Sequence, residues 1–155
     1  SVEGSENGGT PTGVVGARVL LVDDEPMVLE VLGRTLTRAG LKVITAGAGK
    51  AALEALAQTA FDVVVSDIAM PELDGLALLR AVRERDPDVP VLLMTGRPDM
   101  KTAVEAVELG ALQYLIKPFD KTELLEAVSR AVSLSQLGRV KREAIGYLEG
   151  TSELA

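Results

Sequence analysis

The sequence predicts an α/β fold, a doubly wound three-layer sandwich in which a five-stranded parallel sheet lies between two layers of helices. Five short apolar runs alternate with five longer segments whose apolar residues recur at helical spacing. Most of the short runs are apolar at successive positions, which is typical of parallel strands buried on both faces. With 155 residues, 47% of them hydrophobic, the chain can build a single core of this kind.

The strands are predicted where an apolar run stops at a polar residue or a turn. The third run is the clearest, because it is mostly β-branched and ends on Asp67 just before the Met70-Pro71 turn. The predicted strands are Arg18 to Val22, Leu41 to Thr45, Phe61 to Ser66, Pro90 to Met94 and Leu112 to Ile116.

A predicted helix follows each strand, as right-handed crossovers between parallel strands require. Pro26 suits the first turn of the first helix and Gly40 stops it, while the second helix is rich in alanine. Asp86-Pro87-Asp88 breaks the third helix, and Gly110 stops the fourth. The predicted helices are Pro26 to Ala39, Lys50 to Ala60, Leu76 to Arg85, Asp99 to Leu109 and Asp120 to about Leu148.

The chain is predicted to have three parts. Residues 1–16 hold five glycines among polar residues and are expected to be a flexible leader without core contacts. Residues 17–134 form the domain. Residues 135–155 extend the last helix with an unsupported apolar stripe, and such a stripe usually packs on something. We expect a helical linker toward an output domain missing from this chain, or toward a second copy; Gly138 and Gly146 leave a break in this helix open.

Composition excludes several kinds of chemistry. The formal charge of -7 argues against nucleic-acid binding by this domain, and the one modest basic cluster is Arg139, Lys141 and Arg142. The absence of Cys and His removes thiolate chemistry, disulfides, histidine bases and histidine metal ligands. No run is apolar and long enough to cross a membrane or to act as a signal peptide, so a cytoplasmic location is expected.

Chemically active side chains stand at the carboxyl ends of four predicted strands, and these ends share one rim of the sheet. They are Asp23 and Asp24 after the first strand, Asp67 after the third, Thr95 after the fourth and Lys117 after the fifth. Crowded carboxylates repel one another unless a hard cation neutralises them, and Mg²⁺ prefers oxygen ligands of this type. A lysine and a hydroxyl beside such a site favour a phosphoryl group, which a carboxylate oxygen of Asp67 can accept by in-line attack.

The segments VLLVDDEP, VVVSDIAMPELDG, LLMTG and YLIKPF, in this order, resemble the receiver domain of two-component response regulators, a flavodoxin-like fold. The resemblance covers Ala17 to Leu134. It implies that Asp67 is the phosphoacceptor, that a sensor histidine kinase or phosphotransfer protein is the donor, and that the domain is a signalling switch which catalyses only its own phosphorylation and dephosphorylation. It also implies metal binding by Asp23, Asp24, Asp67 and the backbone carbonyl of Ala69, phosphate binding by Lys117, switching by Thr95 and Tyr114, and a cis bond at Lys117-Pro118.

Two other functions are compatible with parts of the sequence. Gly47 and Gly49 fit a dinucleotide fingerprint after a strand, with Asp67 about twenty residues on as a ribose-binding acid. That assignment leaves four residues unexplained, namely Asp23, Asp24, Thr95 and Lys117. The other alternative is a pseudo-receiver that acts without phosphorylation.

The sequence says less about the output domain that the receiver would control than about the receiver itself. Ala111 to Tyr114 lacks the acidic pair found there in receivers of winged-helix regulators, which argues against their salt-bridged dimer. The segment GRVKREAIGYLEG resembles linkers ahead of cyclic-dinucleotide phosphodiesterase domains. A homodimer through the last helix is the other possibility.

Overall fold

A five-stranded parallel sheet with strand order β2-β1-β3-β4-β5 forms the centre of the protein. The computed structural model describes residues 14–154, with side chains described for residues 14–149. The strands are β1 (Arg18–Val22), β2 (Lys42–Ala46), β3 (Val63–Asp67), β4 (Val91–Thr95) and β5 (Gln113–Ile116). Because the chain runs from β1 outward to β2 and then back to β3, the winding direction reverses between β1 and β3, where α/β sheets bind ligands.

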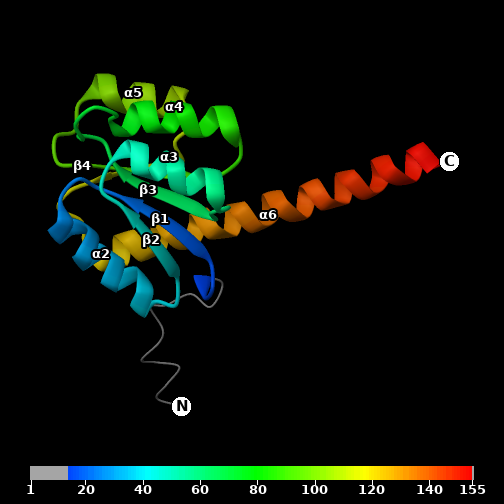
Figure 1. The fold of residues 1–155 in the computed structure, drawn as a ribbon, viewed down its shortest axis with the longest axis horizontal. Helices are drawn as coiled ribbons and strands as arrows, with labels where there is room; N and C mark the ends of the chain where they lie inside the picture. Colours follow the sequence, from blue (N-terminus) through cyan, green and yellow to red (C-terminus); the bar gives the residue numbers. More distant parts are fainter. Residues whose placement is uncertain (1–13, 155) are drawn as a thin grey trace, which may run out of the picture.

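Helices cover both faces of the sheet, which confirms the predicted three-layer sandwich. Figure 1 shows α2 and α6 on one face and α3, α4 and α5 on the other, and a separate hydrophobic cluster fills each interface. The helices are α2 (Pro26–Arg38), α3 (Gly49–Gln58), α4 (Gly75–Arg85), α5 (Met100–Glu108) and α6 (Lys121–Leu154).

Strands β2, β3 and β4 end one residue later than predicted, and for β3 and β4 the difference matters for the site. Asp67 and Thr95 are the last residues of β3 and β4, where they pair with Met94 and Ile116 in the parallel ladder. A polar side chain does not prevent backbone pairing, so the ladder continues onto the two residues whose side chains were expected just beyond it. Both functional groups are therefore held by sheet backbone.

The described fold begins before the predicted domain boundary at residue 17. Val14 is buried in the core, and Gly16 donates a backbone hydrogen bond of 2.8 Å to the carbonyl of Gly40. Glycine content alone had placed these residues in the leader. Residues 1–13 of that leader lie outside the described residues.

Helix α6 is continuous from Lys121 to Leu154, so a break at Gly138 or Gly146 is not observed. Its first part packs on the sheet through buried Leu124, Val128 and Val132. At 1.5 Å per residue the helix is about 50 Å long, and its second half projects from the body (Figure 1). No helix in the described part of the chain is long and apolar enough to cross a membrane.

Candidate functional site

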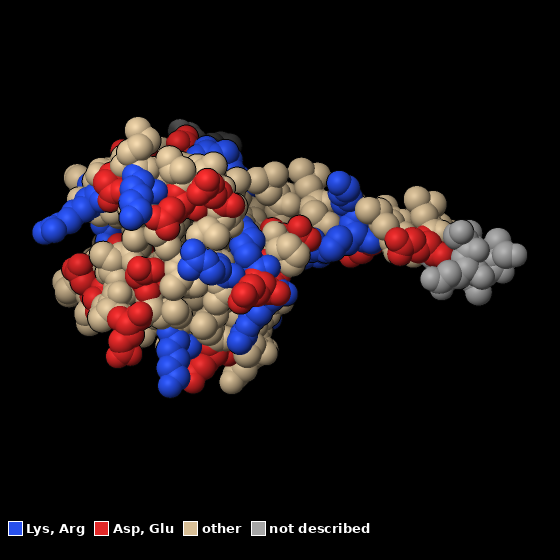
Figure 2. Space-filling model, turned by 90° about the horizontal axis from the view of Figure 1, so that it is seen from above, with Lys and Arg blue, Asp and Glu red and all other residues tan. Residues whose placement is uncertain are grey.

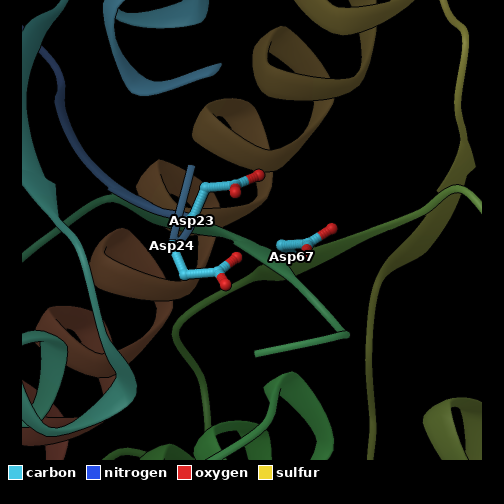
Figure 3. Close-up of side chains that lie close together, drawn as sticks. All are labelled: Asp23, Asp24 and Asp67. Atoms are coloured by element: carbon cyan, nitrogen blue, oxygen red, sulfur yellow. The ribbon is translucent and has the colours of Figure 1, made fainter. Parts of the chain in front are cut away.

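Three carboxylates meet at the carboxyl edge of the sheet, between β1 and β3. Asp23 and Asp24 follow β1, and Asp67 ends β3; the two strands are in register, with Val22 opposite Ser66. Oxygens from all three side chains lie within 4.8 Å of one another (Figure 3). Asp23 and Asp67 are buried and Asp24 is exposed, so the cluster has buried walls and opens to solvent on one side.

Lys117 supplies the cation of this site from the turn after β5. Its Nζ lies 3.0 Å from Oδ1 of Asp67 and donates a hydrogen bond of 3.3 Å to Oδ2 of Asp23. Its backbone N–H donates to the carbonyl of Thr95 at 2.7 Å, and the bond to Pro118 is cis, as the resemblance implied. One lysine thus connects the ends of β1, β3 and β4.

The charges in the site do not balance. Three carboxylates face one ammonium group, which leaves two excess negative charges. Burial raises the pKa of Asp67, and the charges of Asp23 and Asp24 add to the rise against the opposing hydrogen bond and charge of Lys117. Burial alone would lower the pKa of Lys117, but its hydrogen bond to Asp67 and the two buried carboxylates outweigh burial and raise that pKa. An all-oxygen cluster with this charge fits a divalent hard cation such as Mg²⁺.

Backbone contacts orient the acids. Oδ1 of Asp23 accepts a hydrogen bond of 2.9 Å from the N–H of Glu25, which fixes the carboxylate at the start of α2. The sequence analysis did not predict this contact, although an acid three residues before a helix start is a recognisable signal for it. Asp23 is therefore positioned by both Glu25 and Lys117.

The turn between β3 and α4 is held by backbone contacts next to Asp67. Gly75 donates a hydrogen bond of 2.8 Å to the carbonyl of Ile68, and Asp74 caps α4 by accepting one of 2.9 Å from Ala77. A Cβ atom at Gly75 would lie only 2.4 Å from the carbonyl oxygen of Asp67. The sequence indicated the turn but not this close approach, for which the Asp-Gly pair at the helix start was the available signal.

The predicted switch residues lie on neighbouring strands. Thr95 is buried at the end of β4, and its hydroxyl oxygen accepts a hydrogen bond of 3.0 Å from the N–H of Arg97. Tyr114 on β5 packs against the cluster beneath α3, α4 and α5, and its buried hydroxyl has no hydrogen-bond partner among the described residues. Ala69, whose carbonyl was expected to bind metal, lies exposed in the turn after β3.

The two glycines of the dinucleotide alternative lie where β2 passes into α3. A Cβ atom at Gly49 would lie 2.8 Å from both the Cβ and the carbonyl oxygen of Leu73, so this glycine lets α3 pack against the turn after β3. Gly47 is exposed, with nothing within 4 Å of a Cβ atom built there. Neither observation points to a pyrophosphate.

The fold and the acid, lysine and hydroxyl groups on its carboxyl rim define a signal-receiving α/β domain. Residues 19–129 match the family model of the response regulator receiver domain. The chain therefore belongs to this family and is a receiver domain of two-component signalling, as the sequence motifs predicted.

Sequence relatives and a solved structure support the same family assignment. The chain is 44% identical to the DNA-binding transcriptional regulator NtrC of Klebsiella pneumoniae over 80% of its own length and 26% of that protein. It is 40% identical to the response regulator protein FleR of Pseudomonas aeruginosa over 90% of its length and 27% of that protein. A receiver domain protein of Clostridium thermocellum superposes with a TM-score of 0.75 at 32% identity, over 78% of this chain and 98% of that one. The chain thus spans about a quarter of the length of these curated relatives.

Replacing Asp67 by asparagine should stabilise the protein in the presence of a chelator. A carboxyl whose pKa is raised by folding stabilises the fold at low pH, and this contribution is lost as pH rises through the raised pKa. Near neutral pH the ionised Asp67 therefore opposes folding. We expect Asp67→Asn to raise Tm at pH 7 by roughly 2–4 °C, the shift that about 1 kcal/mol produces in a chain of this size.

The advantage of Asp67→Asn over wild type should shrink as pH falls toward 4 and when Mg²⁺ is added. Glu126→Gln, on the exposed side of α6, removes the same charge outside the cluster and serves as the control. Thermal unfolding followed by circular dichroism measures both. A Tm for Asp67→Asn below that of wild type at pH 7 would contradict the expected repulsion.

Proposed function

We propose that this domain accepts a phosphoryl group on Asp67 from the phosphohistidine of a sensor histidine kinase or phosphotransfer protein. The single observation that carries the proposal is the position of Lys117, whose Nζ lies 3.0 Å from an Asp67 oxygen in a cluster of three carboxylates. A carboxylate that only closes a turn would not need a partly buried lysine and two further acids beside it. The chain has no histidine, which is consistent with an external donor.

The transfer forms one bond and breaks one. An Asp67 carboxylate oxygen attacks phosphorus, an O–P bond forms, and the P–N bond to the donor imidazole breaks. The electron pair of that bond stays on the imidazole nitrogen. Lys117 remains protonated, as its raised pKa requires, and places its positive charge beside the equatorial phosphoryl oxygens.

Mg²⁺ is the proposed cofactor. Asp23, Asp24 and Asp67 would hold it together with the backbone carbonyl of Ala69, and the net charge of the cluster supports a divalent ion. When bound, it supplies charge neutralisation for the incoming phosphoryl group. The protein's own contribution is orientation, because Glu25 and Lys117 fix Asp23 and the sheet backbone fixes Asp67.

The proposed switch uses Thr95 and Tyr114. A phosphoryl group on Asp67 would offer a charged acceptor to the O–H of Thr95, whose oxygen accepts a hydrogen bond from the N–H of Arg97. A shift of Thr95 would change the packing of Tyr114 one strand away, whose hydroxyl has an unused hydrogen-bonding capacity. The domain would act as a switch that catalyses only its own phosphorylation and dephosphorylation.

The domain boundaries, the output domain and the location in the cell are also proposals. We infer a domain that includes Val14 in its core and ends at residue 134, and a helical linker of residues 135–155. This linker leads to an output domain or pairs two copies through exposed Leu137, Val140 and Leu148. The name of the relative NtrC, a DNA-binding transcriptional regulator, favours transcriptional regulation over a cyclic-dinucleotide phosphodiesterase as the output. The domain would work in the cytoplasm, and its net charge of -7 argues that any nucleic-acid contact belongs to another domain.

Phosphorylation by a small-molecule donor tests the proposed function. Incubation with acetyl phosphate and Mg²⁺ should add one phosphoryl group, and mass spectrometry after borohydride reduction should place it on Asp67. Asp67→Ala should show no incorporation, whereas Asp120→Ala should behave like wild type because Asp120 only caps α6. Equal incorporation into Asp67→Ala and wild type would reject Asp67 as the acceptor, and no incorporation into wild type would favour a pseudo-receiver.

A further inference from the structure

Two arginines on the second half of α6 bind acids at the sheet edge opposite the carboxylate cluster. Nη2 of Arg139 forms a salt bridge with Oδ1 of Asp62, and Nη1 of Arg142 forms one of 2.9 Å with Oδ2 of Asp88. The partners are separated by 77 and 54 residues along the chain. These contacts therefore join the part of α6 beyond residue 134 to two loops of the domain.

The acids that receive α6 are themselves held in place. Asp62 directly precedes β3, and its second oxygen accepts a hydrogen bond of 2.8 Å from the backbone N–H of Arg18. Its side chain is 16% exposed, which is low for one half of a surface ion pair. Asp88 lies in the loop before β4, where its backbone N–H donates a hydrogen bond of 2.9 Å to the carboxylate of Asp86. Contacts with neighbouring residues therefore hold the carboxylate of Asp62 and the backbone of Asp88.

Apolar packing does not explain why α6 lies against these loops. Among the side chains of α6 that the structure describes, the last fully buried one is Val132, and Leu134 and Leu137 are already 48% and 65% exposed. A groove of about 120 Å³ separates this part of α6 from the loops that carry Phe61 and Val89. Figure 2 shows the helix leaving the body as a narrow projection that carries basic side chains. Polar contacts therefore hold this part of α6 against the two loops.

We propose that the Arg139–Asp62 and Arg142–Asp88 pairs form a clip that fixes the direction in which α6 leaves the domain. Two of the three residues of the basic cluster noted in the sequence thereby acquire an intramolecular role. The clip acts on the entry ends of β3 and β4, and the exit ends of the same strands carry Asp67 and Thr95. It goes beyond the proposed phosphorylation and does not depend on it.

Hydrogen–deuterium exchange of the whole chain tests the clip. The double variant Arg139→Gln and Arg142→Gln keeps good helix formers while removing both pairs. Amides of residues 133–142 should exchange about tenfold faster than in wild type, as expected for two exposed ion pairs, while residues 124–132 keep their protection. In 1 M NaCl the amides of residues 133–142 in wild type should exchange nearly as fast as in the double variant, because surface ion pairs are screened at that ionic strength.

Lys141 provides the matched control, because it lies between the two arginines and forms no ion pair among the described residues. Lys141→Gln should exchange like wild type. The swap Asp88→Arg with Arg142→Asp should restore protection that Arg142→Asp alone removes, since both side chains are more than half exposed and can exchange places. Wild-type exchange in the double glutamine variant, or equal acceleration by Lys141→Gln, would overturn the clip.

Discussion

Replacing Lys117 by methionine should reduce phosphorylation from acetyl phosphate by about 10²–10³-fold, the usual cost of removing one preorganised donor from a transition state. Methionine keeps the length of the lysine stem and removes its charge. Lys117 is the cation within hydrogen-bonding distance of both Asp23 and Asp67, so the variant also leaves two buried carboxylates without their partner. Initial rates of incorporation with saturating Mg²⁺ measure the first effect.

The same substitution should destabilise the metal-free protein by about 2 kcal/mol. Breaking a buried ion pair costs about 3–5 kcal/mol, and we reduce this figure because the Lys117 side chain is 25% exposed. Adding Asp67→Asn should recover part of the loss by removing one of the uncompensated carboxylates. Mg²⁺ should recover stability but not the phosphorylation rate, because it neutralises the cluster without replacing the lysine.

Lys121→Met is the control, since Lys121 is exposed and lies outside the site at the start of α6. It should change neither the rate nor Tm by a measurable amount. Wild-type rates in Lys117→Met would show that the lysine only packs beside Asp67. Rates are compared at a temperature where circular dichroism shows both variants folded.

Most of the fold could be predicted because each strand is an apolar run that stops abruptly at a polar residue or a turn. Asp67 and Thr95 end apolar runs, so the sequence alone indicated which rim of the sheet carries the chemistry. The exact ends were less predictable, because backbone pairing continues regardless of side-chain polarity and drew both residues into the ladder. Val14 was missed because its burial depends on a core built by distant segments.

Contacts between distant residues account for the rest of what the sequence did not show. The hydrogen bond from Lys117 to Asp23 spans 94 residues, and the pair of Arg139 with Asp62 spans 77. Composition and residue spacing reflect local conformational preferences, so they do not indicate which distant residues form a pair. The continuity of α6 through Gly138 was also open, because a glycine in a helix costs only about 1 kcal/mol and surrounding residues can offset it.

Gly75→Ala should lower both stability and phosphorylation, although it adds a single methyl group. The added Cβ would lie 2.4 Å from the carbonyl oxygen of Asp67 and 2.7 Å from the Cα of Ile68. Both are backbone atoms at the end of β3, so a rotamer change cannot relieve the clash. We expect a loss of about 3 kcal/mol, the upper part of the range for overpacking.

The catalytic effect of Gly75→Ala follows from the same geometry. Relief of the clash must move α4 or the end of β3, and the second movement displaces Asp67 from Lys117. A misplacement of about 1 Å can reduce a transfer rate by about 10²-fold. Gly47→Ala adds the same methyl group to an exposed loop with nothing within 4 Å and should leave both Tm and rate near wild type. If the two variants unfolded at the same temperature and reacted equally fast, the close approach of Gly75 to Asp67 would have no role in positioning the acceptor.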